Sequence, residues 1–151
     1  MENHCNELII KTLPHAQNIE MPSYATFGSA CMDIRAALKE DFLLKAGERF
    51  LCPTGLVFVI KEGFEVQIRP RSGMALKHGI TVLNSPGTID SDYRGEVHIM
   101  LINLSKLDFI ITPSMRVAQF LLAKCEKFQL KLSNDISDTN RGAGGFGSTG
   151  Y

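Results

Sequence analysis

Polar residues with the chemistry to bind or activate a small molecule gather in residues 84–97, whose sequence is Asn-Ser-Pro-Gly-Thr-Ile-Asp-Ser-Asp-Tyr-Arg-Gly-Glu-Val. The Pro-Gly pair predicts a turn, and Asp90 directly follows an apolar residue, which indicates a carboxylate at the end of a strand. The Arg-Gly pair then predicts a reversal into a strand over residues 96–103, so the segment is typical of a hairpin. The alternative is an ordinary polar hairpin tip with no chemical role.

A second segment carries groups that suit an anion. Arg71, Ser72 and Gly73 begin a predicted helix over residues 74–78, with Ser72 as its N-cap and Gly79 in the left-handed position at its end. A helix start that combines free amides, a hydroxyl and a guanidinium can bind phosphate. Plain capping with a surface arginine explains the same residues and stays open as the alternative.

A single acid, Asp33, lies between apolar neighbours in residues 29–36. An unpaired charge in such surroundings is costly unless it is solvated or paired. The residue therefore predicts either a functional carboxylate or a salt-bridged strand residue.

The Gly-rich residues 141–150 fit two nucleotide motifs only superficially. Glycines 142, 144 and 147 match the dinucleotide-binding pattern, and residues 142–149 match a P-loop except that Ser148 replaces the lysine. Both motifs need a strand before them and a helix after them, so we expect neither. What remains is an arm whose guanidinium, aromatic ring, hydroxyls and amides suit a polyphosphate and a flat base. A disordered tail is the alternative.

The elements that must position these groups are short strands separated by turns. One of them, residues 64–69, alternates apolar and polar residues with a period of two, as in a half-buried strand. The other expected strands span residues 8–13, 42–44, 49–51, 56–60, 80–83, 96–103, 109–111, 116–124 and 128–132. Residues 42–44 and 49–51 read as one hairpin. The pattern predicts an all-β fold, a distorted jelly-roll barrel with one short helix. We expect residues 1–132 to form this barrel and residues 133–151 to form a mobile, Gly-rich C-terminal arm of the same domain.

Composition excludes several classes of protein. The 151 residues carry a formal net charge of +0, so no global basic field favours nucleic acid, and we expect no stable nucleic-acid binding. The polar N-terminus and the lack of an apolar run of about 18 residues indicate no signal segment and no membrane span, and hence a cytoplasmic protein. The spacing of the four cysteines suggests neither a zinc site nor a disulfide framework.

Taken together, five segments of the chain resemble the five ordered motifs of the trimeric dUTP diphosphatase (dUTPase) family. The segments are Ala30–Ala36, Pro70–Ala75, Gly87–Glu96, Arg116–Gln119 and Arg141–Gly150. The resemblance implies hydrolysis of dUTP to dUMP and pyrophosphate by water attack at the α-phosphorus, with Mg²⁺ held on the triphosphate. This reaction limits uracil incorporation into DNA and supplies the dTMP precursor.

The resemblance also assigns roles to residues of the nucleoside half of the site. Asp90 matches the catalytic acid that orients and deprotonates the water, which an ionised carboxylate can do. Tyr93 matches the ring that packs on the deoxyribose and leaves no room for a 2′-hydroxyl. Asn84 would read the uracil edge. The remaining substrate-binding residues implied here are Thr88, Ile89 and His98.

The phosphate half of the site follows from the other motifs. Arg71, Ser72 and Gly73 match the phosphate-binding segment, Gln119 is a further phosphate contact, and Asp33 matches the acid that meets the metal through water. The arm residues implied to close over the substrate are Arg141, Phe146, Gly147, Ser148 and Thr149. In this family the arm crosses to another subunit of a homotrimer, so that three chains share each site.

Two positions depart from the family pattern, because Cys31 and Ser114 stand where the family commonly has glycine. We expect altered turns there rather than lost activity. Two other functions compete with the one implied. The related dCTP deaminase would need a catalytic glutamate in the pocket and usually lacks the Gly-rich arm, and a non-catalytic nucleotide sensor would not need complete motifs. The first 24 residues carry no motif that we can interpret.

Overall fold

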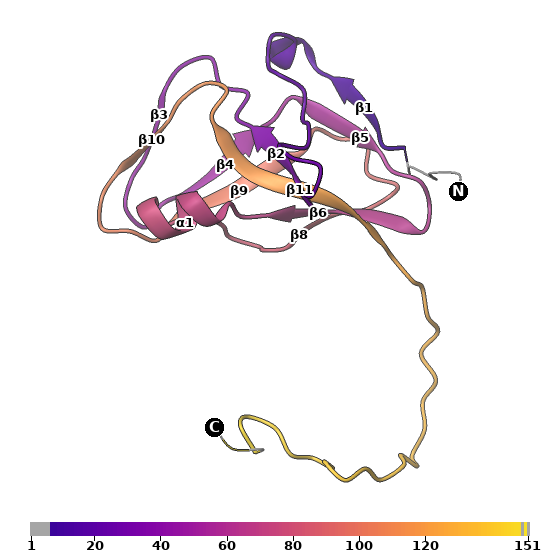
Figure 1. Ribbon diagram of the computed structural model, residues 1–151. Coiled ribbons are helices and arrows are strands. Elements are labelled where there is room, and N and C mark those ends of the chain that lie inside the picture. The colour runs from indigo at the N-terminus through magenta and orange to yellow at the C-terminus, as the bar shows by residue number, and fades with distance from the viewer. Residues whose placement is uncertain (1–6, 149, 151) are drawn as a thin grey trace.

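The computed structural model describes residues 7–148 and residue 150, and nearly all of its regular structure is β-strand, which confirms the predicted all-β class. Figure 1 shows the strands wrapped around one core, with a single short α-helix at one side. The strands are β1 Ile9–Thr12, β2 Met32–Arg35, β3 Phe42–Leu44, β4 Arg49–Pro53, β5 Leu56–Val59, β6 Phe64–Arg69, β7 Ile80–Val82, β8 Gly87–Ile89, β9 His98–Asn103, β10 Phe109–Ile111 and β11 Arg116–Lys124. A 3₁₀ turn, η1 Pro14–Ala16, and the helix α1 Ser72–His78 complete the set. Among the described residues, no helix is both long enough and apolar enough to cross a membrane.

The strands pair in four antiparallel sheets. A four-stranded sheet has the order β2-β11-β6-β8, a three-stranded sheet has the order β4-β9-β7, and β1 pairs with β5 as β3 does with β10. Within the described part of the chain these ladders do not join into one closed barrel, and packing between the sheets holds the all-β fold together. Ile34, Phe58, Val66, Ile99 and Leu101 are among the fully buried residues that form the shared core.

The predicted strands over residues 42–44 and 49–51 exist, but they do not form the predicted hairpin. β3 pairs with β10 and β4 pairs with β9, so the chain changes sheets at the turn between them. The buried Asn103 stabilises the turn between β3 and β4. Its side-chain amide donates to the Leu44 carbonyl at 3.0 Å, and its backbone carbonyl accepts the Gly47 N–H at 2.8 Å. Two long-range pairings and a satisfied buried amide therefore outweigh the local turn.

Helix α1 begins at Ser72, two residues before the predicted start at residue 74. Arg71 is the N-cap and Ser72 is already helical, with no side-chain cap hydrogen bond, so the prediction of Ser72 as N-cap was wrong. The extended backbone of Arg71 comes from strand β6, which leads directly into the helix through Pro70. The C-terminal end is as predicted, because Gly79 has a φ of 66° and its N–H donates to the Ala75 carbonyl.

The last strand, β11, ends at Lys124, and the described residues beyond it contain no further strand. The expected strand over residues 128–132 was wrong, although its apolar residues alternate. Phe128, Leu130 and Leu132 are exposed, and no strand within residues 7–148 pairs with them to complete a ladder. Figure 1 shows this segment leaving the body of the protein as an extended chain.

Candidate functional site

The first part of the site is a pocket of about 310 Å³ at the junction of β8, β9 and β4, which we call the nucleoside-side pocket. It is lined by Leu51, Thr88, Ile89, Asp90, Tyr93, Glu96, Val97 and His98. The structure therefore brings together five residues that the sequence predicted for the nucleoside half of the site. Asn84 lies apart from that lining, on the exposed turn between β7 and β8, with its amide packed towards Gly87.

The loop of residues 90–97 is not the predicted hairpin. β8 pairs only with β6, whereas β9 pairs with β4 and β7, so the loop connects two different sheets. The pocket lies in the opening that this change of sheet creates. A true hairpin would have filled that space with cross-strand pairs.

Internal hydrogen bonds hold Tyr93 in the wall of the pocket. Its hydroxyl donates to the Glu96 carbonyl at 2.9 Å, and its N–H donates to the Asp90 carbonyl at 3.2 Å. A side chain at position 95 would collide with the ring, because a Cβ on Gly95 would lie 2.4 Å from the tyrosine hydroxyl. The ring is thus fixed at its polar end, while 43% of the residue stays exposed to receive a ligand.

The Glu96 carboxylate lies behind this wall and is mostly buried. Its Oε1 accepts the Gly55 N–H at 2.7 Å and the His15 Nε2–H at 2.9 Å. Burial by itself would raise the pKa of Glu96, but the hydrogen bonds from His15 and Gly55 and the nearby charges of His15 and His98 outweigh it and lower the pKa below its ordinary 4.5. Glu96 is therefore an ionised structural anchor at neutral pH.

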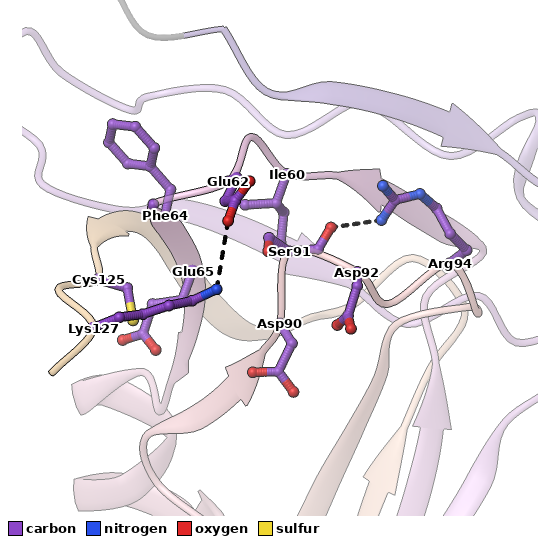
Figure 2. Close-up of a pocket in the computed structure, with 11 residues that line it drawn as sticks. Ile60, Glu62, Phe64, Glu65, Asp90, Ser91, Asp92, Arg94, Cys125 and Lys127 are labelled. Carbon is purple, nitrogen blue, oxygen red and sulfur yellow. Dashed lines mark hydrogen bonds and ion pairs between the residues drawn. The ribbon is translucent and has the colours of Figure 1, made fainter. Parts of the chain in front are cut away.

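Asp90 also borders a larger cleft of about 620 Å³ on the other side of the loop (Figure 2). In Figure 2 the Asp90 carboxylate points away from the Glu62–Lys127 ion pair, whose charged atoms lie 3.5 Å apart. Four carboxylates line the cleft against two cations, so the cleft is unsuited to a polyphosphate. The acidic residues are Glu62, Glu65, Asp90 and Asp92.

The second part of the site, the phosphate-side cluster, consists of Asp33, Arg71, Arg116 and Gln119. Arg71 Nε donates to Asp33 Oδ1 at 2.8 Å, and Arg116 Nη1 donates to Asp33 Oδ2 at 3.1 Å. Gln119 stands opposite Asp33 in the β2–β11 register, and its amide donates to the Pro70 carbonyl at 2.9 Å. The cluster adjoins a cavity of about 350 Å³ that Asp33, Gln119 and Cys31 help to line. Ser72 and Gly73 follow directly in the first turn of α1.

The two departures from the family pattern have different outcomes. Cys31 precedes the part of β2 that is regularly paired, since Met32, Asp33 and Ile34 face consecutive residues of β11. The register shift of this ladder lies at its other end, between Arg116 and Ala118, opposite Ile34 and Arg35. Ser114 has a φ of 62°, in the left-handed region that favours glycine. Its carbonyl still accepts a hydrogen bond from Arg35 at 3.1 Å, so the turn is kept.

The nucleoside-side pocket and the phosphate-side cluster lie at opposite edges of one sheet. Asp33 is on β2, the first strand in the order β2-β11-β6-β8, and Asp90 directly follows β8, the last. Three interstrand spacings of about 4.8 Å separate the two strands by roughly 14 Å. A single chain therefore does not place these two carboxylates in one pocket.

The arm forms a third, separate group. Arg141 donates from Nε to the Gly144 carbonyl at 2.9 Å, and Phe146 and Ser148 are exposed. Gly147 has a φ of 87°, which glycine adopts without strain. Thr149 lies outside the described residues. Arg141, Phe146 and Ser148 thus lie on a segment that extends away from the body of their own chain and lines neither the nucleoside-side pocket nor the cavity beside Asp33.

The described part of the chain offers a divalent cation no closed cage of ligands. The described residues contain no group of three or more histidine, cysteine, aspartate or glutamate side chains that could hold a metal ion. Each Asp33 oxygen accepts one arginine N–H, which leaves lone pairs for water. The remaining lone pairs of the Asp33 carboxylate suit a magnesium ion that keeps its water ligands. Such an ion is commonly bound mainly by the phosphates of a substrate.

Reasoning from sequence missed Arg116 of the phosphate-side cluster and several residues around the nucleoside-side pocket. Among the latter, Leu51 lines the pocket from β4, Glu96 anchors its loop, and His15 contacts Glu96. Arg116 and Glu96 stand in recognised motifs, which was an available signal. Leu51 and His15 gave none, because only the pairing of distant segments brings them to the pocket.

Polar side chains of this all-β domain line concave pockets, as the polar groups of small-molecule sites commonly do. Comparison with known proteins defines the domain further. The sequence pattern of the dUTPase family matches residues 17–150. Proteins named deoxyuridine 5'-triphosphate nucleotidohydrolase are 54% identical in Bartonella henselae, over 95% of this chain and 83% of that protein, and 58% identical in Rickettsia canadensis, over 86% and 88%. The chain belongs to the dUTPase family.

Solved structures agree with this assignment. The Staphylococcus bacteriophage 80alpha dUTPase with dUpNHpp has a TM-score of 0.80 and 25% identity, covering 97% of this chain and all of that one. A mutant of the same phage enzyme has a TM-score of 0.81 at 24% identity, over 95% of this chain and 98% of that one. The second comparison supports the fold alone.

Proposed function

We propose that this protein hydrolyses dUTP to dUMP and pyrophosphate. The observation that carries the proposal is the nucleoside-side pocket, where Asp90 and the pinned ring of Tyr93 share one wall of a cavity large enough for a base and sugar. Family membership supports the substrate, and so does the phage relative solved with dUpNHpp, a dUTP analogue. Removal of dUTP would limit uracil incorporation into DNA and supply the precursor of dTMP.

Asp90 is the proposed catalytic base. Its carboxylate accepts a proton from water as the water oxygen forms a bond to the α-phosphorus, and the bond from that phosphorus to the bridging oxygen breaks to release pyrophosphate. Its position at the end of β8 supports this role, since the strand holds the backbone while the side chain borders open space on both sides of the loop. A fixed base near the reacting water lowers the barrier mainly by orientation.

The base and sugar would be recognised by the pocket wall. Tyr93 packs on the deoxyribose and excludes a 2′-hydroxyl, while Thr88, Ile89 and His98 complete the lining. Asn84 reads the uracil edge from the neighbouring turn. Its exposed amide can offer both a donor and an acceptor.

The phosphates would be held by the phosphate-side cluster. Arg71, with two of its donors already fixed by protein oxygens, presents the others to an anion, and Ser72, Gly73 and Gln119 lie on adjoining elements. Mg²⁺ on the triphosphate neutralises phosphate charge, and Asp33 would meet it through water. This division agrees with the electrostatics, because the cleft beside Asp90 is acidic and the cluster carries two arginines.

A homotrimer with shared sites would bring the two halves together. The roughly 14 Å between the sheet edges that carry Asp33 and Asp90 supports this, since one chain offers only half a site at each edge. The arm, residues 133–151, would then reach a neighbouring subunit, where Arg141, Ser148 and Thr149 bind the γ-phosphate, Gly147 gives a backbone contact and Phe146 stacks on uracil. Its extended course away from its own body supports this role.

One assay tests the proposal. Purified protein is incubated with dUTP, dCTP, dTTP or UTP in the presence of Mg²⁺, and pyrophosphate and ammonia are measured. We expect rapid release of pyrophosphate from dUTP and at most slow release from UTP, dCTP and dTTP. Ammonia from dCTP would identify a deaminase, and tight dUTP binding without turnover would identify a sensor; either result overturns the proposal.

A further inference from the structure

His15 lies outside the part of the chain that the dUTPase family pattern matches, yet it reaches the back of the nucleoside-side pocket. Its Nε2 lies 2.9 Å from Glu96 Oε1, across 81 positions of sequence. A carboxylate can only accept, so the imidazole is the donor. The side chain of His15 is 32% exposed and that of Glu96 only 17%, so the contact lies at the edge of the body, where solvent screens it in part.

The turn that carries His15 is firmly seated. The Leu13 N–H donates to the Gly55 carbonyl at 2.8 Å, and Ala16 is 1% exposed. Gly55 has a φ of 66°, and a Cβ there would lie 2.0 Å from the Ala16 Cβ, so only glycine allows η1 to pack this closely. The same Gly55 donates its N–H to Glu96 Oε1 at 2.7 Å. The N-terminal turn, Gly55 and Glu96 therefore form one connected unit.

Glu96, which the N-terminal turn and Gly55 hold in place, in turn contacts two residues of the pocket. Its carbonyl accepts the Tyr93 hydroxyl at 2.9 Å and lies 3.1 Å from His98 Nδ1, which must carry the proton because a carbonyl cannot donate. Tyr93 and His98 both line the nucleoside-side pocket. A chain of hydrogen bonds thus runs from His15 through Glu96 to the ring proposed to exclude a 2′-hydroxyl.

We propose that His15 is a positioning residue that acts through Glu96 to hold Tyr93 and so sharpens the choice of 2′-deoxyribose over ribose. The proposal rests on the function proposed above. Without the His15 hydrogen bond, the Glu96 carboxylate keeps the Gly55 N–H at 2.7 Å and a longer contact with His98 Nε2 at 3.8 Å. The loop of residues 90–97 then gains freedom. A looser Tyr93 ring admits the ribonucleotide more easily and binds dUTP less well.

The kinetic test compares His15→Ala with His15→Gln, whose amide can still donate to Glu96. For His15→Ala we expect the KM for dUTP to rise about threefold to tenfold, kcat to change less than about twofold, and the ratio of kcat/KM for dUTP over UTP to fall about threefold to tenfold. His15→Gln should stay within about twofold of the wild type. Gln17→Ala, an exposed substitution beside the same turn, is the matched control and should change nothing.

A second readout does not depend on turnover. Hydrogen exchange measured by mass spectrometry should show faster exchange across residues 93–97 in His15→Ala and not in His15→Gln, with thermal unfolding used to confirm that both variants fold. Unchanged exchange and unchanged selectivity in His15→Ala overturn the proposal, and so does a His15→Gln protein that behaves like His15→Ala. If the wild type itself hydrolyses no dUTP, the proposed function fails, and exchange alone then decides whether His15 positions the loop.

Discussion

Arg71 and Asp33 form an ion pair in which Nε lies 2.8 Å from Oδ1, and Arg71 Nη1 also donates to the Arg116 carbonyl at 3.1 Å. These two anchors fix the plane of the guanidinium and leave its other donors available. Preorganisation of this kind lowers the cost of ordering a side chain when an anion binds. The pair therefore prepares Arg71 for phosphate rather than merely neutralising Asp33.

Arg71→Lys should impair binding although it keeps the charge. A lysine cannot donate to Asp33, the Arg116 carbonyl and a phosphate in one plane, so we expect the KM for dUTP to rise at least about tenfold. Steady-state pyrophosphate release measures this. Arg69→Lys is the matched control, because the Arg69 side chain donates to Gln67 and only the backbone of Arg69 pairs with Gln119 of the cluster. A KM for dUTP equal to that of the wild type would show that the fixed plane of the Arg71 guanidinium does not contribute to dUTP binding.

Asp90→Asn should lower kcat by about 10²–10⁴, because the amide cannot accept the proton of the attacking water. Affinity for a non-hydrolysable dUTP analogue, measured by calorimetry, should stay within a few-fold. Asp92→Asn is the control, since Asp92 lines the acidic cleft but not the nucleoside-side pocket. Equal losses in the two variants would argue for a general electrostatic effect instead of base catalysis.

Mixed trimers test whether the two halves of the site come from different chains. Asp90→Asn and Arg71→Ala proteins should each be nearly inactive alone. Co-expressed at equal amounts, they should recover about a quarter of wild-type activity, because random assembly pairs an intact Asp90 with an intact Arg71 at about one site in four. If both residues served the same site from one chain, no mixed site would be intact and nothing would be recovered.

Removal of the arm should separate assembly from catalysis. A chain that ends at Asn140 loses Arg141 and Phe146, which are exposed and contribute no core. We expect light scattering to report an unchanged trimer and pyrophosphate release to fall by at least about tenfold, since closure excludes water and strengthens phosphate contacts. Full activity in the shortened protein would refute the role proposed for the arm.

Acid should weaken the fold through Glu96. Its pKa is lowered in the folded state, so its stabilising contribution is present above its ordinary value of 4.5 and is lost as the pH falls through the lower folded-state pKa. Urea unfolding of the wild type should therefore show stability falling below pH 4.5, and Glu96→Gln should show a shallower fall. Identical pH dependence in the two proteins would mean that the contact with His15 contributes nothing to stability.

Much of the chain could be predicted because local chemistry encodes it. The alternation of residues 64–69 predicted the half-buried β6, and Gly79 ends α1 in the left-handed conformation that the sequence indicated. Five of the residues that line the nucleoside-side pocket were also predicted, and three of them, Thr88, Asp90 and Tyr93, are close in sequence. Local signals fail where a strand forms only if another strand pairs with it. Residues 128–132 alternate apolar and polar side chains, but no strand within the described part of the chain pairs with them.

By itself, the sequence determined which residues carry chemistry and that the fold is built of strands, because side-chain periodicity and turn preferences act over a few residues. Tertiary structure decided which strands meet. It placed Asp33 and Asp90 at opposite edges of one sheet, and it brought His15 to Glu96. The physical reason is that strand pairing and core packing are contacts between distant segments, and their register depends on the whole chain at once.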